Sequence, residues 1–271
     1  MFDWLKKKKN EEVKKENDMP NGIPGTAVPL INNPMVKNLD RIDIQIGRSA
    51  PGYLDSRYRT VNGETEDYSK LAESVATLLR VRRVGTLAVA GEGILDCADK
   101  VNPVLEMAAV YNIENRYVIT DGKTGDRDSA AAVIGYACNG VVIPDECEPS
   151  ALLEELTEEI PVIKVSEQKD AKSGTPAGGC AAEVFGNALN DVRSLMIDPD
   201  GTARVCGFPI GNCLERDLID ILEEYDPYSN PIMAMILQGG PDAAAALCTP
   251  EEAGLPRCQR CRAMAARLFA E

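Results

Sequence analysis

The feature that most constrains the fold of this chain is a regular alternation of strand and helix patterns between residues 39 and 165. Apolar residues with period two, or in short continuous runs, predict strands at 41–46, 85–90, 116–120, 141–143 and 161–165. Apolar residues at helical spacing predict helices at 67–83, 99–111, 127–138 and 151–159. Consecutive strands separated by helices pair in parallel through right-handed crossovers. We therefore expect an α/β fold.

An open barrel and a doubly wound sheet both satisfy this alternation, and both bind ligands at the carboxyl ends of their strands. The loops after the first three strands are therefore the first candidates for a functional site, at 47–56, 91–96 and 121–125. The second of these contains Gly91-Glu92-Gly93, where the acid can meet an amino group or a ribose. A glutamate in such a loop is more often simply solvated, so both interpretations stay open.

A second pattern begins after a polar, glycine-rich stretch at 166–179. A hairpin is predicted at 195–206, because the turn Asp198-Pro199-Asp200-Gly201 ends in a glycine that accepts a positive φ. Helices are predicted at 180–189, 214–224, 230–238, 242–247 and 261–270. The C-terminal part therefore has a small α+β pattern of its own.

The composition excludes several classes of function. The 271 residues carry a net charge of -14, which argues against nonspecific binding to nucleic acid or to an anionic membrane. The chain contains no histidine, so histidine bases and histidine metal ligands are excluded. We find neither a secretory signal nor an apolar run of transmembrane length, and we expect a cytoplasmic protein with reduced thiols.

Residues 1–38 are predicted to form a flexible charged tail. Four lysines at 6–9 precede a stretch with repeated proline and glycine, a composition that disfavours regular structure. The simplest interpretation is a solvated leader and linker. An alternative is a docking arm in which Phe2, Trp4 and Leu5 contact a protein partner.

The spacing Cys258-x-x-Cys261 is the strongest signal of chemistry in the chain. Two thiols at this spacing can hold one metal ion or two corners of an iron-sulfur cluster. Nearby arginines would offset the negative charge of such a site and favour thiolates, at positions 257, 260 and 262. Cys97, Cys138 and Cys147 have no cysteine neighbours and are expected to be small buried residues. An iron-sulfur cluster, a zinc ion and no metal all remain open on these residues alone.

The order of motifs in this C-terminal part resembles the SPASM or twitch domain of radical S-adenosylmethionine (SAM) enzymes. The matching features are a strand and tight turn, Gly201-x4-Cys206, then Ile210-Gly211-Asn212 opening a helix, and the late Cys-x-x-Cys. The resemblance implies one auxiliary [4Fe–4S] cluster, since six thiols in this region are few for two. The ligands that it implies are Cys180, Cys206, Cys258 and Cys261, with Cys248 and Cys213 as further candidates.

The N-terminal part resembles the partial (βα) barrel of the same family. Gly91-Glu92-Gly93 matches a motif that meets the methionine part of SAM, and Thr120-Asp121-Gly122 matches a second family motif. The resemblance therefore implies a partial (βα) barrel over 39–170 and a SPASM/twitch-like α+β domain over 171–271. It also implies Gly91, Glu92 and Gly93 as binding residues for SAM.

The chain departs from the family at its defining motif. The family has three cysteines after the first strand, whereas no cysteine precedes Cys97 here. Ser49, Tyr53 and Ser56 stand at the spacing of the missing thiols, and hydroxyls do not replace thiolates around iron at ordinary affinity. Without that cluster no electron reaches SAM, so we expect that this chain is not a self-sufficient radical SAM enzyme.

Three functions remain as hypotheses. The first is a non-catalytic iron-sulfur protein that serves as an accessory or electron-transfer partner in a protein, peptide or cofactor maturation complex. Its partner would be a competent radical SAM enzyme or that enzyme's target. The second is an enzyme that binds SAM or a nucleotide-like ligand in the barrel and does redox chemistry at the cluster. The third is a zinc-stabilised binding module.

Overall fold

The computed structural model describes residues 31–48, 63–144, 147–165, 189–255 and 257–269. These residues lie within one compact unit, Ile31–Glu271. Most of the predicted tail, the glycine-rich stretch at 166–179 and the predicted helix over 180–188 lie outside the described residues.

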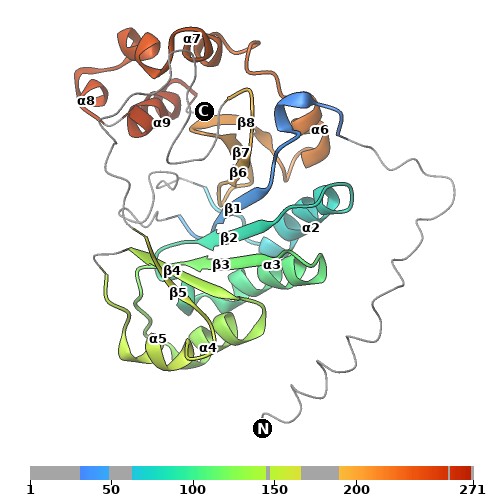
Figure 1. Ribbon diagram of the computed structural model, residues 1–271, viewed down its shortest axis with the longest axis vertical. Coiled ribbons are helices and arrows are strands. Elements are labelled where there is room, and N and C mark those ends of the chain that lie inside the picture. The colour runs from blue at the N-terminus through green and yellow to red at the C-terminus, as the bar shows by residue number, and fades with distance from the viewer. Residues whose placement is uncertain (1–30, 49–62, 145–146, 166–188, 256, 270–271) are drawn as a thin grey trace, which may run out of the picture. The chain divides into compact units, whose positions relative to one another are not determined.

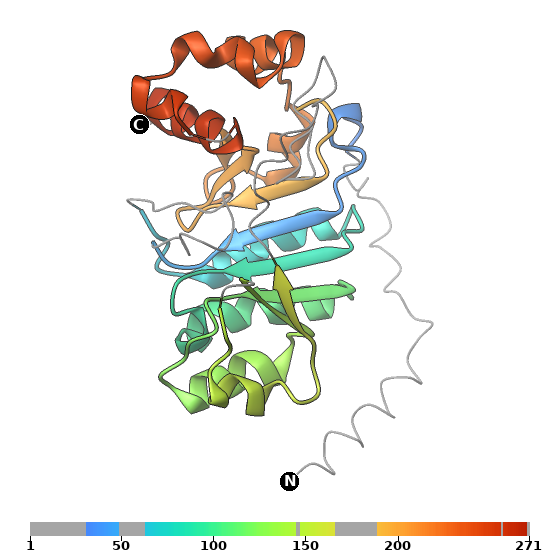
Figure 2. The same cartoon turned by 60° about the vertical axis from the view of Figure 1, so that its left-hand side comes forward.

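In the described residues, eight strands form a single sheet. In chain order they are β1 (Arg41–Gln45), β2 (Thr86–Ala90), β3 (Asn115–Ile119), β4 (Gly140–Pro144), β5 (Val162–Val165), β6 (Ser194–Ile197), β7 (Thr202–Val205) and β8 (Phe208–Asn212). The order across the sheet is β5-β4-β3-β2-β1-β6-β7-β8, with β1 in the middle (Figure 2). Every neighbouring pair from β5 through β1 to β6 is parallel. Strand β7 is antiparallel to β6, and β8 is antiparallel to β7. The sheet therefore continues across the domain boundary predicted near residue 170.

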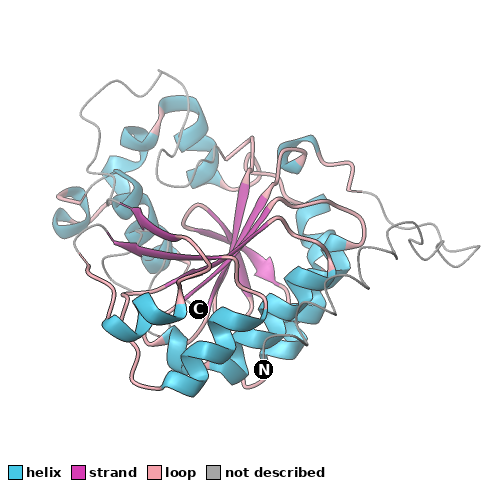
Figure 3. Cartoon of the chain, turned by 60° about the horizontal axis from the view of Figure 1, so that its bottom comes forward, coloured by secondary structure: helices cyan, strands magenta, loops and turns pink. Residues whose placement is uncertain are grey.

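Four helices connect the first five strands, and they cover one face of the sheet (Figures 1 and 3). They are α2 (Tyr68–Leu79), α3 (Ala98–Val110), α4 (Arg127–Tyr136) and α5 (Ala151–Leu156). The side chains of Asp67, Asp126 and Ser150 accept backbone hydrogen bonds and cap α2, α4 and α5, so the predicted Ser150 cap is confirmed. Because each new strand joins the same edge, every right-handed crossover lies on the same face. This order is that of a partial barrel and not of a doubly wound sheet.

The two faces of the sheet differ in character. Ile42, Ile44, Leu87 and Val89 point to the helices and belong to the main core. The opposite face carries a smaller apolar cluster of Ala88, Ala90, Ile119, Val142 and Met196. On β1 this opposite face is polar, because Asp43 and Gln45 alternate with the isoleucines and both are fully buried. The inner face of the partial barrel thus holds buried polar groups beside its apolar residues.

The C-terminal part begins with the predicted hairpin, which forms as β6 and β7 around the turn at 198–201. The helices that follow are α6 (Leu218–Glu223), α7 (Pro231–Gly239), the 3-10 helix η3 (Pro241–Leu247), α8 (Pro250–Ala253) and α9 (Arg257–Leu268). The rings of Phe208 and Phe269 meet edge to face with centroids 6.1 Å apart, which fixes the end of α9 against β8. Two further 3-10 turns are η1 (Pro34–Val36) and η2 (Ile94–Asp96).

One predicted element is wrong. Ile210-Gly211-Asn212 was expected to open a helix, but these residues are the end of β8. The backbone N–H of Cys213 donates to the Gly201 carbonyl over 2.8 Å, and the Asn212 side chain donates to the Asp200 carbonyl over 2.9 Å. These bonds hold the segment along β7, and the helix begins only at Leu218, behind its cap Asp217. Likewise, the helix predicted at 261–270 begins earlier, at Arg257.

Candidate functional site

The carboxyl ends of β1 and β2 lie close together because of a glycine. The backbone N–H of Ile46 donates to the Ala90 carbonyl over 2.8 Å, which continues the pairing just beyond the strands. A Cβ at Gly91 would overlap the backbone oxygen of Ile46, so only glycine permits this approach. Gly93 has a φ of 63° and turns the chain into η2. Gly91-Glu92-Gly93 therefore lies at a strand end, as its sequence context predicts, with the Glu92 side chain exposed to solvent.

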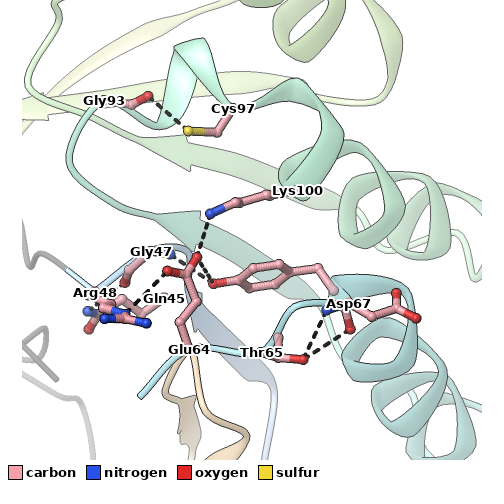
Figure 4. A network of polar contacts seen from close by, with 10 residues as sticks. Gln45, Gly47, Arg48, Glu64, Thr65, Asp67, Gly93, Cys97 and Lys100 are labelled. Carbon is pink, nitrogen blue, oxygen red and sulfur yellow. Dashed lines mark hydrogen bonds and ion pairs between the residues drawn. The ribbon is translucent and has the colours of Figure 1, made fainter. Parts of the chain in front are cut away.

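A polar network fills the space beside these strand ends (Figure 4). Its centre is Glu64, whose side chain is only 16% exposed. Lys100 of α3 donates to this carboxylate over 2.6 Å, and the hydroxyl of Tyr68 donates to it over 3.2 Å. The backbone N–H of Gly47 in turn donates to the Tyr68 hydroxyl over 2.9 Å. The Arg48 guanidinium lies 3.8 Å from the other oxygen of Glu64, so two cations flank one carboxylate.

The electrostatics of this network follow from its partial burial. Burial, and then the nearby Glu64 charge, raise the pKa of the Tyr68 hydroxyl despite the opposing hydrogen bond from Gly47. The hydrogen bond to Glu64 raises the pKa of Lys100. Tyr68 therefore stays neutral and Lys100 stays charged at physiological pH. The network ties the end of β1 to the first turns of α2 and α3.

The loop after β3 is anchored to the loop after β2. Asp96 accepts hydrogen bonds from the Thr124 hydroxyl at 2.6 Å and from the backbone N–H groups of Gly125 and Asp126 at 3.1 Å each. Partial burial opposes ionisation, but these hydrogen bonds outweigh it and lower the pKa of Asp96. Asp121 accepts a bond from the Lys123 N–H over 3.2 Å within its own turn. The described parts of the loops after β1, β2 and β3 are thus joined to one another at the carboxyl edge of the sheet.

The predicted thiol ligands are distributed over two regions. Cys206 occupies the β7–β8 turn with a φ of 56° and is buried. Cys213 follows the other end of β8 and is also buried, and its carbonyl accepts the Ser74 hydroxyl over 2.7 Å. A five-residue strand separates these two cysteines, which corresponds to roughly 17 Å. In this conformation Cys206 and Cys213 do not share a single metal site.

Cys248 and Cys261 lie in the second region, where η3 meets α9. Burial raises the pKa of the Cys261 thiol to about 11; the Arg260 guanidinium lowers it, while Cys248 and Asp242 raise it further. These three groups are therefore near enough to the Cys261 thiol to act on its charge. Cys258 is on α9 one turn before Cys261, but its side chain is outside the described residues, as is all of Cys180. Within the described part, no three cysteine or acidic side chains lie close enough to hold a metal ion together.

Arg260 provides a test of whether this second region suits an anionic metal group. One of its terminal nitrogens donates to Asp242 over 2.5 Å, and its side chain is 13% exposed. Its Nε–H is buried and has no hydrogen-bond partner among the described residues. A buried donor without an acceptor is unfavourable, so the arrangement suits a thiolate-bound group that would accept this bond. The residue types and the free donor therefore fit an iron-sulfur cluster or a thiolate-bound ion.

Sequence reasoning missed the residues of the polar network. Glu64 and Lys100 are 36 positions apart and belong to no recognisable motif. The only signal available was that both flank loops at strand ends, which is where ligands bind in parallel sheets. Cys97, expected to be buried, is half-buried, and its thiol lies 3.5 Å from the Gly93 carbonyl at the edge of this network.

Comparison with known proteins gives a structural likeness and no sequence family. No family model matches the chain, and no curated protein matches it. The crystal structure of BtrN in complex with AdoMet (S-adenosylmethionine) and 2-DOIA matches with a TM-score of 0.50 at 13% identity, covering 76% of this chain and 90% of BtrN. A structure of BtrN in an open conformation gives a TM-score of 0.45 at 16% identity, covering 74% of this chain and 87% of BtrN.

None of the helices in the described part of the chain is long and apolar enough to span a membrane. The first of the two BtrN structures supports a comparison of folds. The chain has an α/β fold in which a parallel sheet of β/α units is followed by C-terminal antiparallel strands, and this fold resembles the partial barrel of BtrN.

Proposed function

We propose that this chain is a radical-SAM-like protein that does not start a radical reaction by itself and instead acts as an iron-sulfur accessory protein. The observation that carries this proposal is the combination of a BtrN-like fold with a first-strand loop that has no cysteine. No thiol precedes Cys97, so the loop after β1 cannot ligate the cluster that would reduce SAM.

The polar network supports the same proposal. Glu64, Tyr68 and Lys100 lie beside the carboxyl end of β1, where the family resemblance implies the cluster-binding loop. A carboxylate held between Lys100 and Arg48 is a stable electrostatic arrangement that needs no metal. At this end of the barrel, the ion pairs would therefore serve to connect β1 with α2 and α3.

The cysteines at the other end of the chain would supply the cofactor site. Cys248, Cys258 and Cys261 would hold a [4Fe–4S] cluster together with Cys180. Such a cluster supplies one-electron transfer when bound. The partner of this protein would be a competent radical SAM enzyme, or that enzyme's protein, peptide or cofactor target, in a maturation complex.

Anaerobic reconstitution tests this proposal. Wild type should bind iron and sulfide in equal amounts and should show cluster absorbance, while the Cys258→Ala/Cys261→Ala variant should lose both. The matched control is Cys138→Ala, which removes a buried thiol from the β/α units. Incubation with SAM and dithionite should yield no 5′-deoxyadenosine from the isolated chain. A colourless wild type, or zinc in place of iron and sulfide, would contradict the iron-sulfur assignment and favour a zinc-stabilised module.

A second candidate function is the binding of SAM or a nucleotide-like ligand in the barrel. The observations that favour it are the close approach enforced by Gly91 and the AdoMet bound to BtrN. Calorimetry with SAM should then show saturable binding that Gly91→Ala removes and that Glu92→Gln weakens. Heat changes no larger than those of ligand dilution would rule this function out.

A further inference from the structure

We propose that Arg260 is a potential-tuning residue, whose Nε–H donates a hydrogen bond to a sulfur of the thiolate-bound cluster and thereby raises the reduction potential of that cluster. The inference rests on the proposed function, because it requires a cluster in the region of Cys248, Cys258 and Cys261. It assigns to one side chain a role that the cysteine motif does not contain.

The Arg260 guanidinium has a fixed orientation. Asp242, at the start of η3, accepts a bond from a terminal nitrogen of Arg260 over 2.5 Å. This ion pair orients the planar group, since the guanidinium presents its donors in a fixed fork. The Nε–H that remains is buried without a partner among the described residues. The side chain is thus held in place with one donor available.

The Arg260 donor lies near thiols. Arg260 is the immediate neighbour of Cys261 and lies two residues after Cys258 on the same helix. Cys258 precedes Cys261 by three positions along α9. The Cys261 thiol interacts electrostatically with Arg260, Asp242 and Cys248, which places all four groups in one region.

The sulfur atoms of a bound cluster would be suitable acceptors for this donor. A thiol is a weak hydrogen-bond acceptor, whereas the sulfurs of a cluster with four thiolates carry negative charge. Hydrogen bonds and positive charge near those sulfurs stabilise the reduced form, which carries one more negative charge. A buried cation with a free donor therefore shifts the potential upward. Arg267, the other arginine of α9 whose side chain the structure describes, lacks this combination, because its Nε and one terminal nitrogen donate to Glu252 and Leu247.

The test is a redox titration of reconstituted full-length protein with dithionite and mediator dyes, followed by electron paramagnetic resonance. Arg260→Met removes both the charge and the donor, and it should shift the midpoint potential to a more negative value. Arg260→Lys keeps the charge but loses the planar donor, and its shift should be smaller and in the same direction. Arg216→Met is the matched control, because this exposed arginine of the α6 region pairs with Glu224 over 2.9 Å and should leave the potential unchanged.

Iron and sulfide analysis separates the possible failures. A wild type without a cluster overturns the proposed function and this inference with it. A wild type and an Arg260→Met variant with equal iron, equal sulfide and equal midpoint potentials overturn this inference alone. If Arg260→Met does not retain its cluster, Arg260→Lys decides: a potential equal to that of wild type shows that the residue only braces α9 against η3.

Discussion

At the residue scale, Gly91 is a position where the packing of the backbone requires glycine. A methyl group there would overlap the Ile46 carbonyl, so Gly91→Ala must separate two paired strand ends. We expect Gly91→Ala to lower the free energy of unfolding by about 1–3 kcal/mol. In Gly135→Ala, the matched control, the new methyl meets nothing within 4 Å inside α4, and stability should rise by roughly 0.5–1 kcal/mol. Urea denaturation of wild type and both variants measures these changes in stability. Equal midpoints for wild type and Gly91→Ala would show that the two strand ends do not approach each other so closely in solution.

Arg204 and Asp198 form a second residue-scale feature, since both side chains of this ion pair are fully buried. The Arg204 Nε donates to Asp198 over 2.8 Å across the β6–β7 hairpin. We expect Arg204→Met to cost about 3–5 kcal/mol, because it leaves a buried carboxylate without its cation. The double variant Asp198→Asn/Arg204→Met should be more stable than Arg204→Met alone. A double-mutant cycle in urea measures this, and strictly additive effects would mean that the two charges are not coupled.

At the scale of elements, Asp96 joins the loops after β2 and β3 and makes their contact sensitive to pH. Its pKa is lower in the folded protein than the ordinary value of 3.8. The stability that its charge contributes is therefore fully present above that value and is lost as the pH falls through the folded pKa. Thermal unfolding should show wild type more stable than Asp96→Asn at pH 7, with the difference shrinking below about pH 4. A difference that stays constant down to pH 2.5 would mean that the charge is not involved.

The elements also show what could be predicted from the sequence. The β/α alternation over 39–165 was correct in every described strand and α-helix, because each depends on local periodicity and caps such as Ser150. Strand β8 was missed because Pro209 and Gly211 interrupt its pattern, and only pairing with β7 makes it a strand. The Gly91–Gly93 loop could be placed because it directly follows a strand. The Glu64–Lys100 pair could not, because distant segments meet there only after folding.

At the scale of the whole molecule, the net charge of -14 sets a background repulsion. Salt screens repulsion between exposed charges, so the thermal midpoint should rise as sodium chloride is increased from low to physiological concentration. Replacing an exposed acid, as in Glu158→Lys, reduces the repulsion and should weaken this dependence on salt. Differential scanning calorimetry at several salt concentrations gives the slopes. A midpoint that falls with salt in wild type would indicate that attractive ion pairs dominate instead.

The central position of β1 has a consequence for how the chain is made. One edge of β1 pairs early with β2, but its other edge waits for β6, and Asn38 bonds to Asp191 across 153 positions. During synthesis that edge has no native partner until residues near 197 have left the ribosome. Long-range pairing of this kind folds slowly and leaves a strand edge open to other chains. Expression at reduced temperature should therefore raise the soluble yield, because the nascent sheet then has more time to close before it meets another copy.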